Sequence, residues 1–165
     1  MHILHQVAEG LASVHRAGLV HRDIKPDNIM VLKDMAVKLS DFGVAKLPNS
    51  SLTQAGELWG TMQYMSPEQV QGSLDIDAKS DIFSLGVVLF EMLTCKKPFV
   101  GLGAAVVRRI VEAPAPRVST LKPGIPEIFD FIVARALAKK PADRFRDCDE
   151  FAQALKSAVP NPNPG

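Results

Sequence analysis

Apolar side chains near the start of the chain recur at helical spacing. The positions are Ile3, Leu4, Val7, Ala8, Leu11 and Val14. Intervals of three and four residues place such side chains on one face of an α-helix. Gly18 suits the C-terminal cap, because glycine readily adopts left-handed backbone angles. The pattern predicts an amphipathic helix over 3–14 with one face in the core.

Two short β-prone runs follow, at 28–32 and 37–40, separated by the polar pair Lys33-Asp34. Apolar runs that flank a short polar turn indicate a β-hairpin. Residues 41–76 then show no sustained period and are rich in Gly, Ser, Pro, Gln and Thr. Loops of that length in compact domains are usually functional or disordered. The sequence thus predicts a small hairpin followed by a long loop.

The most apolar stretch runs from Ile82 to Leu93. It is apolar on most faces, which is typical of a buried central helix, and Ser80 or Asp81 can cap its start. Polar interruptions occur at Ser84, Gly86 and Glu91. The stretch is shorter than the roughly 18 residues of a membrane span. We therefore expect a central core helix and no membrane span in this segment.

The C-terminal half alternates helical patterns with irregular segments. Further helices are predicted at about 102–112, 126–138 and 148–158. Pro126 fits the first turn of the middle helix. The proline-rich run 114–123 is interpreted as an irregular connector, and 159–165 as a disordered tail. The predicted fold class is mainly α with a small β-hairpin, as one domain over 1–158.

Composition narrows the class of protein. The 165 residues are 47% hydrophobic and 22% charged, as in soluble globular domains. The formal net charge of +1 gives no sign of a nucleic-acid partner. Cys95 and Cys148 form no C-x-x-C pair, so the sequence indicates neither a zinc site nor a disulfide framework. We expect a cytoplasmic location, although a longer chain could be anchored in a membrane.

One loop combines an acid, a cation and an amide, in the run HRDIKPDN at 21–28. Phosphoryl transfer needs such a set. Asp23 can accept the proton of an attacking hydroxyl, and Lys25 can neutralise charge on the transferred group. The Asn28 side-chain oxygen can bind Mg²⁺, and Asp41, in Asp-Phe-Gly, supplies a second oxygen ligand.

These motifs resemble those of the eukaryotic-type serine/threonine protein kinases. The signatures H-R-D-L-x-x-x-N, D-F-G and A-P-E correspond to HRDIKPDN, to DFG at 41–43 and to SPE at 66–68. The run YMSPEQ resembles the bacterial members, and Lys25, two places after Asp23, is the pattern of serine/threonine kinases. The resemblance covers about 1–158 and implies the large, C-terminal lobe of the kinase fold.

The same family holds ATP with a Gly-rich strand turn, a strand lysine and a helix glutamate. None of the three has a match in this sequence. We interpret the chain as a C-terminal-lobe fragment without the small lobe. On this interpretation the chain alone should transfer phosphate negligibly, because positioning is most of the catalysis.

The resemblance also implies roles for individual residues in a reaction that uses ATP and Mg²⁺. Asp23 corresponds to the catalytic base, and Lys25 to the lysine that contacts the γ-phosphate. Asn28 and Asp41 correspond to the metal ligands and contribute to ATP binding. Met30 corresponds to the floor beneath the adenine.

A second group of residues is implied in regulation and substrate positioning. Thr61 corresponds to the residue that bonds to the catalytic loop and shapes the acceptor site. Arg22 resembles the arginine that binds an activation-loop phosphate. Thr53 is the first candidate phosphoacceptor, followed by Ser50 and Ser51.

Three residues are expected to be structural. Asp81 is either a helix cap or a buried anchor for the catalytic-loop backbone. Glu68 and Arg144 are either separate surface charges or, as the family resemblance favours, a buried ion pair.

Three readings of the chain remain open at this point. The first is the large lobe of a serine/threonine kinase that acts on protein hydroxyls. The second is a non-catalytic kinase-like binding or scaffold module, and the third is a poorly folding remnant with an exposed apolar face. A kinase homodimer is a further partner that the sequence leaves open.

Overall fold

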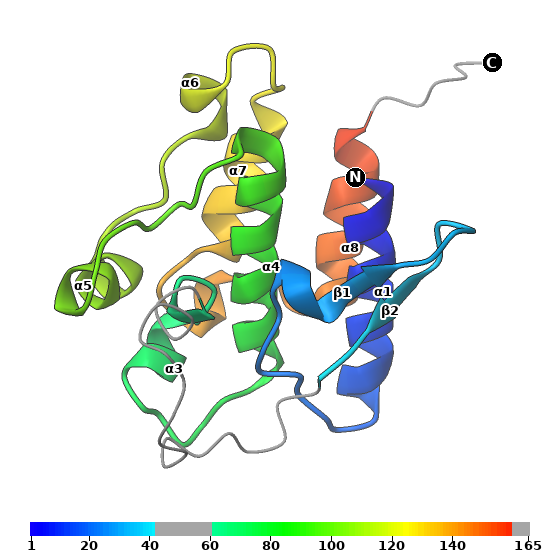
Figure 1. Ribbon diagram of the computed structural model, residues 1–165, viewed down its shortest axis with the longest axis horizontal. Coiled ribbons are helices and arrows are strands. Elements are labelled where there is room, and N and C mark those ends of the chain that lie inside the picture. The colour runs from blue at the N-terminus through cyan, green and yellow to red at the C-terminus, as the bar shows by residue number, and fades with distance from the viewer. Residues whose placement is uncertain (42–60, 160–165) are drawn as a thin grey trace.

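A computed structural model describes residues 1–41 and 61–159 (Figure 1). Helices make up most of it, and one two-stranded antiparallel sheet lies at its side. The helices are α1 (His2–Arg16), α3 (Pro67–Val70), α4 (Ala78–Thr94), α5 (Ala104–Glu112), α6 (Val118–Leu121), α7 (Ile128–Ala136) and α8 (Cys148–Ala158). Short 3-10 turns are η1 (Pro26–Asn28) and η2 (Pro141–Asp143), and the strands are β1 (Ile29–Val31) and β2 (Val37–Leu39).

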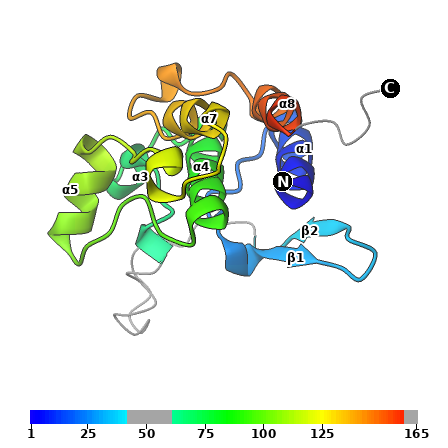
Figure 2. The same ribbon diagram turned by 90° about the horizontal axis from the view of Figure 1, so that it is seen from above.

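Helix α4 is the centre of the core, as its apolar sequence predicts. Phe83, Leu85 and Phe90 are fully buried, and Figure 2 shows α7 and the α1–α8 pair on different sides of α4. A Cβ atom added at Gly86 would lie 2.7 Å from the Cβ of Ala136 on α7. Glycine at this position therefore allows the two helices to pack closely.

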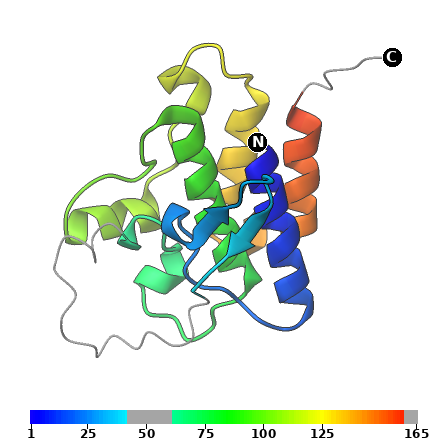
Figure 3. The same cartoon turned by 45° about the vertical axis from the view of Figure 1, so that its right-hand side comes forward.

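The hairpin lies across α1 (Figure 3). Gln6 joins the two, because its side chain donates to the Met35 carbonyl at 3.0 Å and accepts from the Val37 amide at 3.2 Å. Met35 supplies the left-handed turn residue, with φ of 65°, where hairpins more often use glycine or asparagine. The predicted hairpin is confirmed, with strands shorter than the β-prone runs.

The start of α4 differs from the prediction. Asp77 is the N-cap, and its side chain accepts from the Lys79 amide at 2.8 Å. Ser80 and Asp81 lie inside the helix and are buried. The cap interpretation of both residues was wrong, because an earlier aspartate satisfies the free amides of the first turn.

Two short helices lie in segments that were predicted to be irregular. Helix α3 begins at a capping box, in which Ser66 and Gln69 satisfy each other's backbone amides, and the motif S-P-E-Q is its sequence signature. Helix α6 is held by the buried carboxylate of Asp130, which accepts from the Ser119 amide at 2.9 Å.

Pro126 precedes the N-cap Glu127 of α7 rather than lying in its first turn.

A buried ion pair joins the segment around α3 to the C-terminal half. The Arg144 side chain is fully buried, and its guanidinium donates to both carboxylate oxygens of Glu68, at 2.7 and 2.8 Å. Further donations go to the carbonyls of Lys79, Ala138 and Lys139. Burial alone would raise the pKa of Glu68, but hydrogen bonds from Arg144 and Ser80 outweigh it and lower the pKa to about 2.

Among the residues that the structure describes, no helix combines the length and apolarity needed to cross a membrane. The tail at 160–165 lies outside the described residues.

Replacing Arg144 with alanine should strongly destabilise the fold. The Glu68 carboxylate would stay buried without its partner, and breaking such a pair costs about 3–5 kcal/mol, or roughly 10 °C in melting temperature for a chain of this size. Thermal unfolding followed by circular dichroism measures the effect. Arg146→Ala is the matched control, because Arg146 is 80% exposed and pairs with the partly exposed Asp147. Equal melting temperatures for the two variants would contradict a structural role for the pair.

The same pair should make the free energy of unfolding depend on pH in the acid range. The pKa of Glu68 is about 2 in the fold against an ordinary value of 4.5, so its contribution is complete above about pH 5 and disappears as the pH falls towards 2. Urea unfolding gives the free energy of unfolding of the unmodified chain and of Glu68→Gln. The difference between the two values should be smaller at about pH 3 than at pH 7. Glu112→Gln, in an exposed pair with Arg108, should show no such change. If the difference in unfolding free energy between the two proteins did not change with pH, Glu68 could not be the group that causes the pH dependence.

Candidate active site

The backbone of the loop before η1 is held by a carboxylate from α4. Asp81 is fully buried, and its two oxygens accept hydrogen bonds from the amides of His21, at 2.9 Å, and Arg22, at 2.8 Å. Arg22 has a φ of 67°, a backbone conformation that is costly for residues other than glycine. Asp81 therefore stabilises a strained loop immediately before Asp23.

His15 completes this anchor and was missed by the sequence analysis. Its Nε2 atom lies 2.7 Å from the Asp81 carboxylate, and the side chain is 10% exposed. Helix α1, the loop and α4 thus meet at one carboxylate. His15 lies one position beyond the apolar pattern of α1, and only its tertiary partner distinguishes it from a surface residue.

A second set of bonds ties the loop to the segment before Asp41. His21 is buried, and its Nε2 lies 3.0 Å from the Ser40 carbonyl, while its Nδ1 accepts a long bond, 3.4 Å, from the Asp23 amide. The Ser40 amide donates to the Asn28 carbonyl at 3.0 Å. Both backbone polar groups of Ser40 are therefore engaged by the loop, which fixes where Asp41 begins.

The hairpin brings the two predicted metal ligands to the same end of the sheet. Asn28 immediately precedes β1, and Asp41 follows β2 by two residues. In the antiparallel register Ile29 pairs with Leu39, so the start of β1 adjoins the end of β2. Met30, the predicted adenine floor, lies on β1 and is 46% exposed.

The acid, the amide and the cation of the loop contact one another. The Asn28 amide nitrogen donates to the Asp23 carbonyl at 2.7 Å and to its Oδ2 at 3.0 Å. The Lys25 ammonium lies 3.2 Å from the same Oδ2 and 3.4 Å from the Thr61 hydroxyl. The side chains of Asp23 and Lys25 are 17% and 15% exposed, so they are held in place and still accessible.

The oxygen atoms of Asn28 and Asp41 are suitable ligands for a hard cation. The nitrogen of the Asn28 amide is used by Asp23, and the described residues give its oxygen no hydrogen-bond partner. Asp41 is exposed and has a φ of 53°, and among the described residues its side chain bonds only to the Ser40 hydroxyl, at 3.4 Å. An amide oxygen and a carboxylate are ligands that Mg²⁺ accepts together with water and phosphate oxygens. Within 1–41 and 61–159, no group of three or more His, Cys, Asp or Glu could hold a metal.

The predicted regulatory residues are only partly described. Arg22 is exposed, and its carbonyl accepts from the Gln69 side chain at 2.8 Å, which links the loop to the start of α3. Thr53, Ser50 and Ser51 lie outside the described residues.

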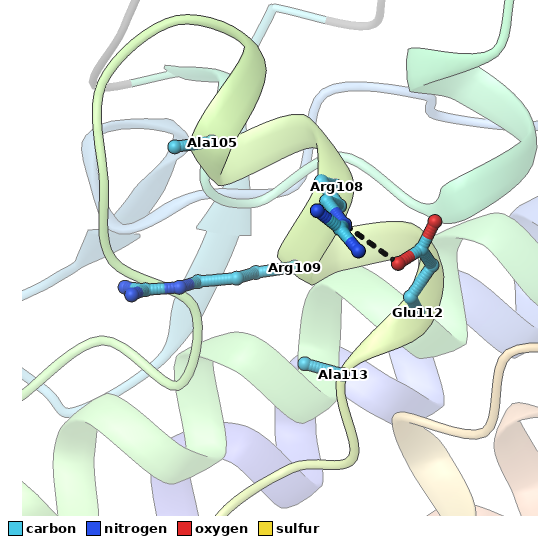
Figure 4. Close-up of a pocket in the computed structure, with 5 residues that line it drawn as sticks. All are labelled: Ala105, Arg108, Arg109, Glu112 and Ala113. Carbon is cyan, nitrogen blue, oxygen red and sulfur yellow. Dashed lines mark hydrogen bonds and ion pairs between the residues drawn. The ribbon is translucent and has the colours of Figure 1, made fainter.

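A cavity of about 530 Å³ lies along α5, away from these residues (Figure 4). It is lined by Ala105, Arg108, Arg109, Glu112 and Ala113. Arg108 and Glu112 are paired at 2.9 Å, whereas Arg109 donates to the Val100 carbonyl and has no carboxylate partner among the lining residues. None of the predicted site residues lines it.

Sequence similarity to known proteins covers nearly the whole chain. The family model of the protein kinase domain matches residues 1–157. The serine/threonine-protein kinase PknL of Mycobacterium tuberculosis is 45% identical over 157 residues, which are 94% of this chain and 39% of PknL. The serine/threonine-protein kinase PknE of the same organism is 39% identical over 158 residues, 95% of this chain and 28% of PknE. PknH of Mycobacterium bovis is 38% identical over 163 residues, 98% of this chain and 27% of PknH.

The chain therefore spans about two fifths of PknL and under a third of the other two. The match is continuous over nearly all of this sequence and includes every motif that forms the site. This chain belongs to the protein kinase domain family.

Proposed function

We propose that this chain carries the catalytic loop of a serine/threonine protein kinase, which transfers the γ-phosphoryl group of ATP to hydroxyls of protein substrates. The main support is the position of the Asp23 carboxylate. Asn28 and Lys25 contact it, and the buried Asp81 anchors the loop on which it lies. Fixed positioning of the acceptor and of charge is the main requirement of phosphoryl transfer.

Asp23 is the proposed base. Asn28 and Lys25 both contact its Oδ2 atom, and the described residues make no hydrogen bond to Oδ1. That second oxygen is free to accept a hydrogen bond from a serine or threonine hydroxyl. It orients the hydroxyl for attack and takes its proton as the new bond to phosphorus forms.

Lys25 is the proposed charge stabiliser. Its ammonium lies between the Asp23 carboxylate and the Thr61 hydroxyl, next to where an acceptor must approach. A fixed cation at this point offsets negative charge on the transferred group without reorganisation. The Thr61 contact also supports its proposed role in shaping the acceptor site.

Asn28 and Asp41 are the proposed Mg²⁺ ligands, and with Lys25 they contribute to ATP binding. When bound, Mg²⁺ neutralises charge on the nucleotide phosphates. The chain's own contribution is to hold an amide oxygen and a carboxylate at one end of the hairpin. The exposed Met30 side chain on β1 offers an apolar surface for the adenine ring.

Arg22 is the proposed sensor of an activating phosphate on Thr53, or on Ser50 or Ser51. Its exposed side chain adjoins the base in sequence, and a phosphate there would add charge-assisted hydrogen bonds that order the segment. Mapping of phosphorylated residues by mass spectrometry in the active full-length protein tests this assignment.

A kinase-like scaffold is the second candidate function. It is favoured by the exposed apolar side chains of the hairpin, Met30, Val31, Leu32 and Met35, which offer a surface to another protein segment. The intact acid, amide and lysine set favours catalysis, because a binding surface has no chemical need for all three.

Loss of either acid should strongly lower activity in a polypeptide that joins these 165 residues to a kinase small lobe with its Gly-rich turn and strand lysine. Asp23→Asn and Asp41→Ala should each lower kcat by about 10²–10⁴-fold, because the first removes the base and the second a metal ligand. Transfer of ³²P from ATP to a serine-containing protein measures the effect. Asp75→Asn is the control, because Asp75 is an exposed acid that makes no hydrogen bond to the loop among the described residues. Full turnover in both acid variants would exclude the proposed catalysis.

The 165-residue chain by itself should transfer phosphate negligibly in the same assay. Its sequence offers no Gly-rich turn or strand lysine to position the nucleotide, and positioning supplies most of the rate. Side-by-side assays of the chain and the joined polypeptide, at equal concentration, make the comparison. A robust ³²P signal from the chain alone would refute this expectation.

A further inference from the structure

A second cluster of charged and polar side chains lies next to the proposed acceptor site. The Tyr64 hydroxyl donates to Oε2 of Glu91 at 2.6 Å, and the Lys97 ammonium lies 2.7 Å from the same oxygen. Lys97 also donates to the Tyr64 hydroxyl, and its Nζ is 3.6 Å from the ring centroid. Glu91 is in the last turns of α4, and Lys97 follows that helix. The three side chains therefore form one closed network.

The network is anchored to the proposed catalytic loop through a short segment, 61–64. The Tyr64 amide donates to the Thr61 carbonyl at 3.1 Å, and its carbonyl accepts from the buried Ser84 hydroxyl at 2.7 Å. The Thr61 hydroxyl in turn contacts Lys25. A substrate whose hydroxyl reaches Asp23 must therefore pass close to this segment.

Lys97 is the counter-ion in this network. Burial raises the pKa of the Tyr64 phenol, and the hydrogen bond and charge of Glu91, with the charge of Asp27, raise it further. Tyr64 thus remains a neutral donor and cannot balance the Glu91 carboxylate. The Glu91 side chain is 31% exposed and that of Lys97 is 20% exposed, so the pair lies within reach of a bound peptide.

We propose that Lys97 determines substrate specificity by occupying the Glu91 carboxylate and so excluding arginine and lysine side chains of a substrate from it. This inference rests on the proposed function, since it assigns the substrate class of that same site. With Lys97 in place, the surface beside the acceptor site has no uncompensated carboxylate at Glu91. The chain then has no preference for arginine or lysine beside the acceptor serine or threonine. Without Lys97, the partly exposed Glu91 carboxylate would be uncompensated and would attract cations.

Binding of two synthetic serine peptides to the 165-residue chain tests the proposal without nucleotide. The peptides differ only in carrying arginine or norleucine at the positions flanking serine, and chemical-shift changes in NMR titrations give their Kd values. The unmodified chain should not prefer the arginine peptide. Lys97→Met should bind it up to about fivefold more tightly than the norleucine peptide, as expected for one partly exposed ion pair.

Matched variants isolate the charge of Lys97. Lys97→Gln keeps a hydrogen-bond donor without the charge and should behave like Lys97→Met, whereas Lys97→Arg should behave like the unmodified chain. Adding Glu91→Gln to Lys97→Gln should remove the preference. Lys96→Met, at the exposed neighbouring lysine, should leave it unchanged. Tyr64 is the chain's single tyrosine, so its ring resonances in NMR spectra show whether Tyr64 stays packed in each variant.

Equal Kd values for the two peptides in folded Lys97→Gln would overturn the specificity role. Such a result would leave phosphate transfer by the joined polypeptide unaffected. Conversely, a failure of phosphate transfer together with the expected peptide preference would reject the proposed catalysis and retain Lys97 as the residue that excludes cations.

Discussion

The active-site geometry depends on one buried carboxylate. Asp81 lies in the first turn of the central helix and accepts from two consecutive loop amides, while His15 contacts it from α1. A buried charge is tolerated only where such hydrogen bonds replace its lost hydration. Because the carboxylate needs the amides and the strained Arg22 backbone needs the carboxylate, each stabilises the other. This mutual requirement also positions Asp23, the proposed base, which follows Arg22 directly.

The hairpin brings together two residues that are distant in the sequence. Asn28 and Asp41 are thirteen positions apart in the chain, but antiparallel pairing brings the start of one strand to the end of the other. Ser40 and His21 then fix the second segment against the loop. Two strands of three residues would be marginal alone, and the bonds of Gln6 to both sides of the turn attach them to α1.

Helix α4 serves as the common platform for both halves of the site. Its apolar residues form the core, and three of its polar residues, Asp81, Ser84 and Glu91, bind the segments of the site. Asp81 binds the loop, whereas Ser84 and Glu91 both hold Tyr64, the first through its carbonyl and the second through its hydroxyl. These polar positions in a buried helix therefore hold the loop at 21–28 and the segment 61–64 against α4.

The sequence by itself determined the main helices, the hairpin and the chemical identity of the loop, because periodicity, turn residues and the run at 21–28 are local properties. The sequence patterns misplaced the start of α4 and missed α3, although the motif S-P-E-Q is the signature of the capping box that begins α3. Only the tertiary structure decided that Asp81 anchors the loop, that His15 joins it and that Lys97 neutralises Glu91. Asp81 is some sixty residues from its amide partners, Tyr64 is 27 from Glu91, and even Lys97, six residues from Glu91, is positioned by the turn that ends α4. Hydrogen bonds and ion pairs of this kind depend on where packing places the elements, which no local pattern encodes.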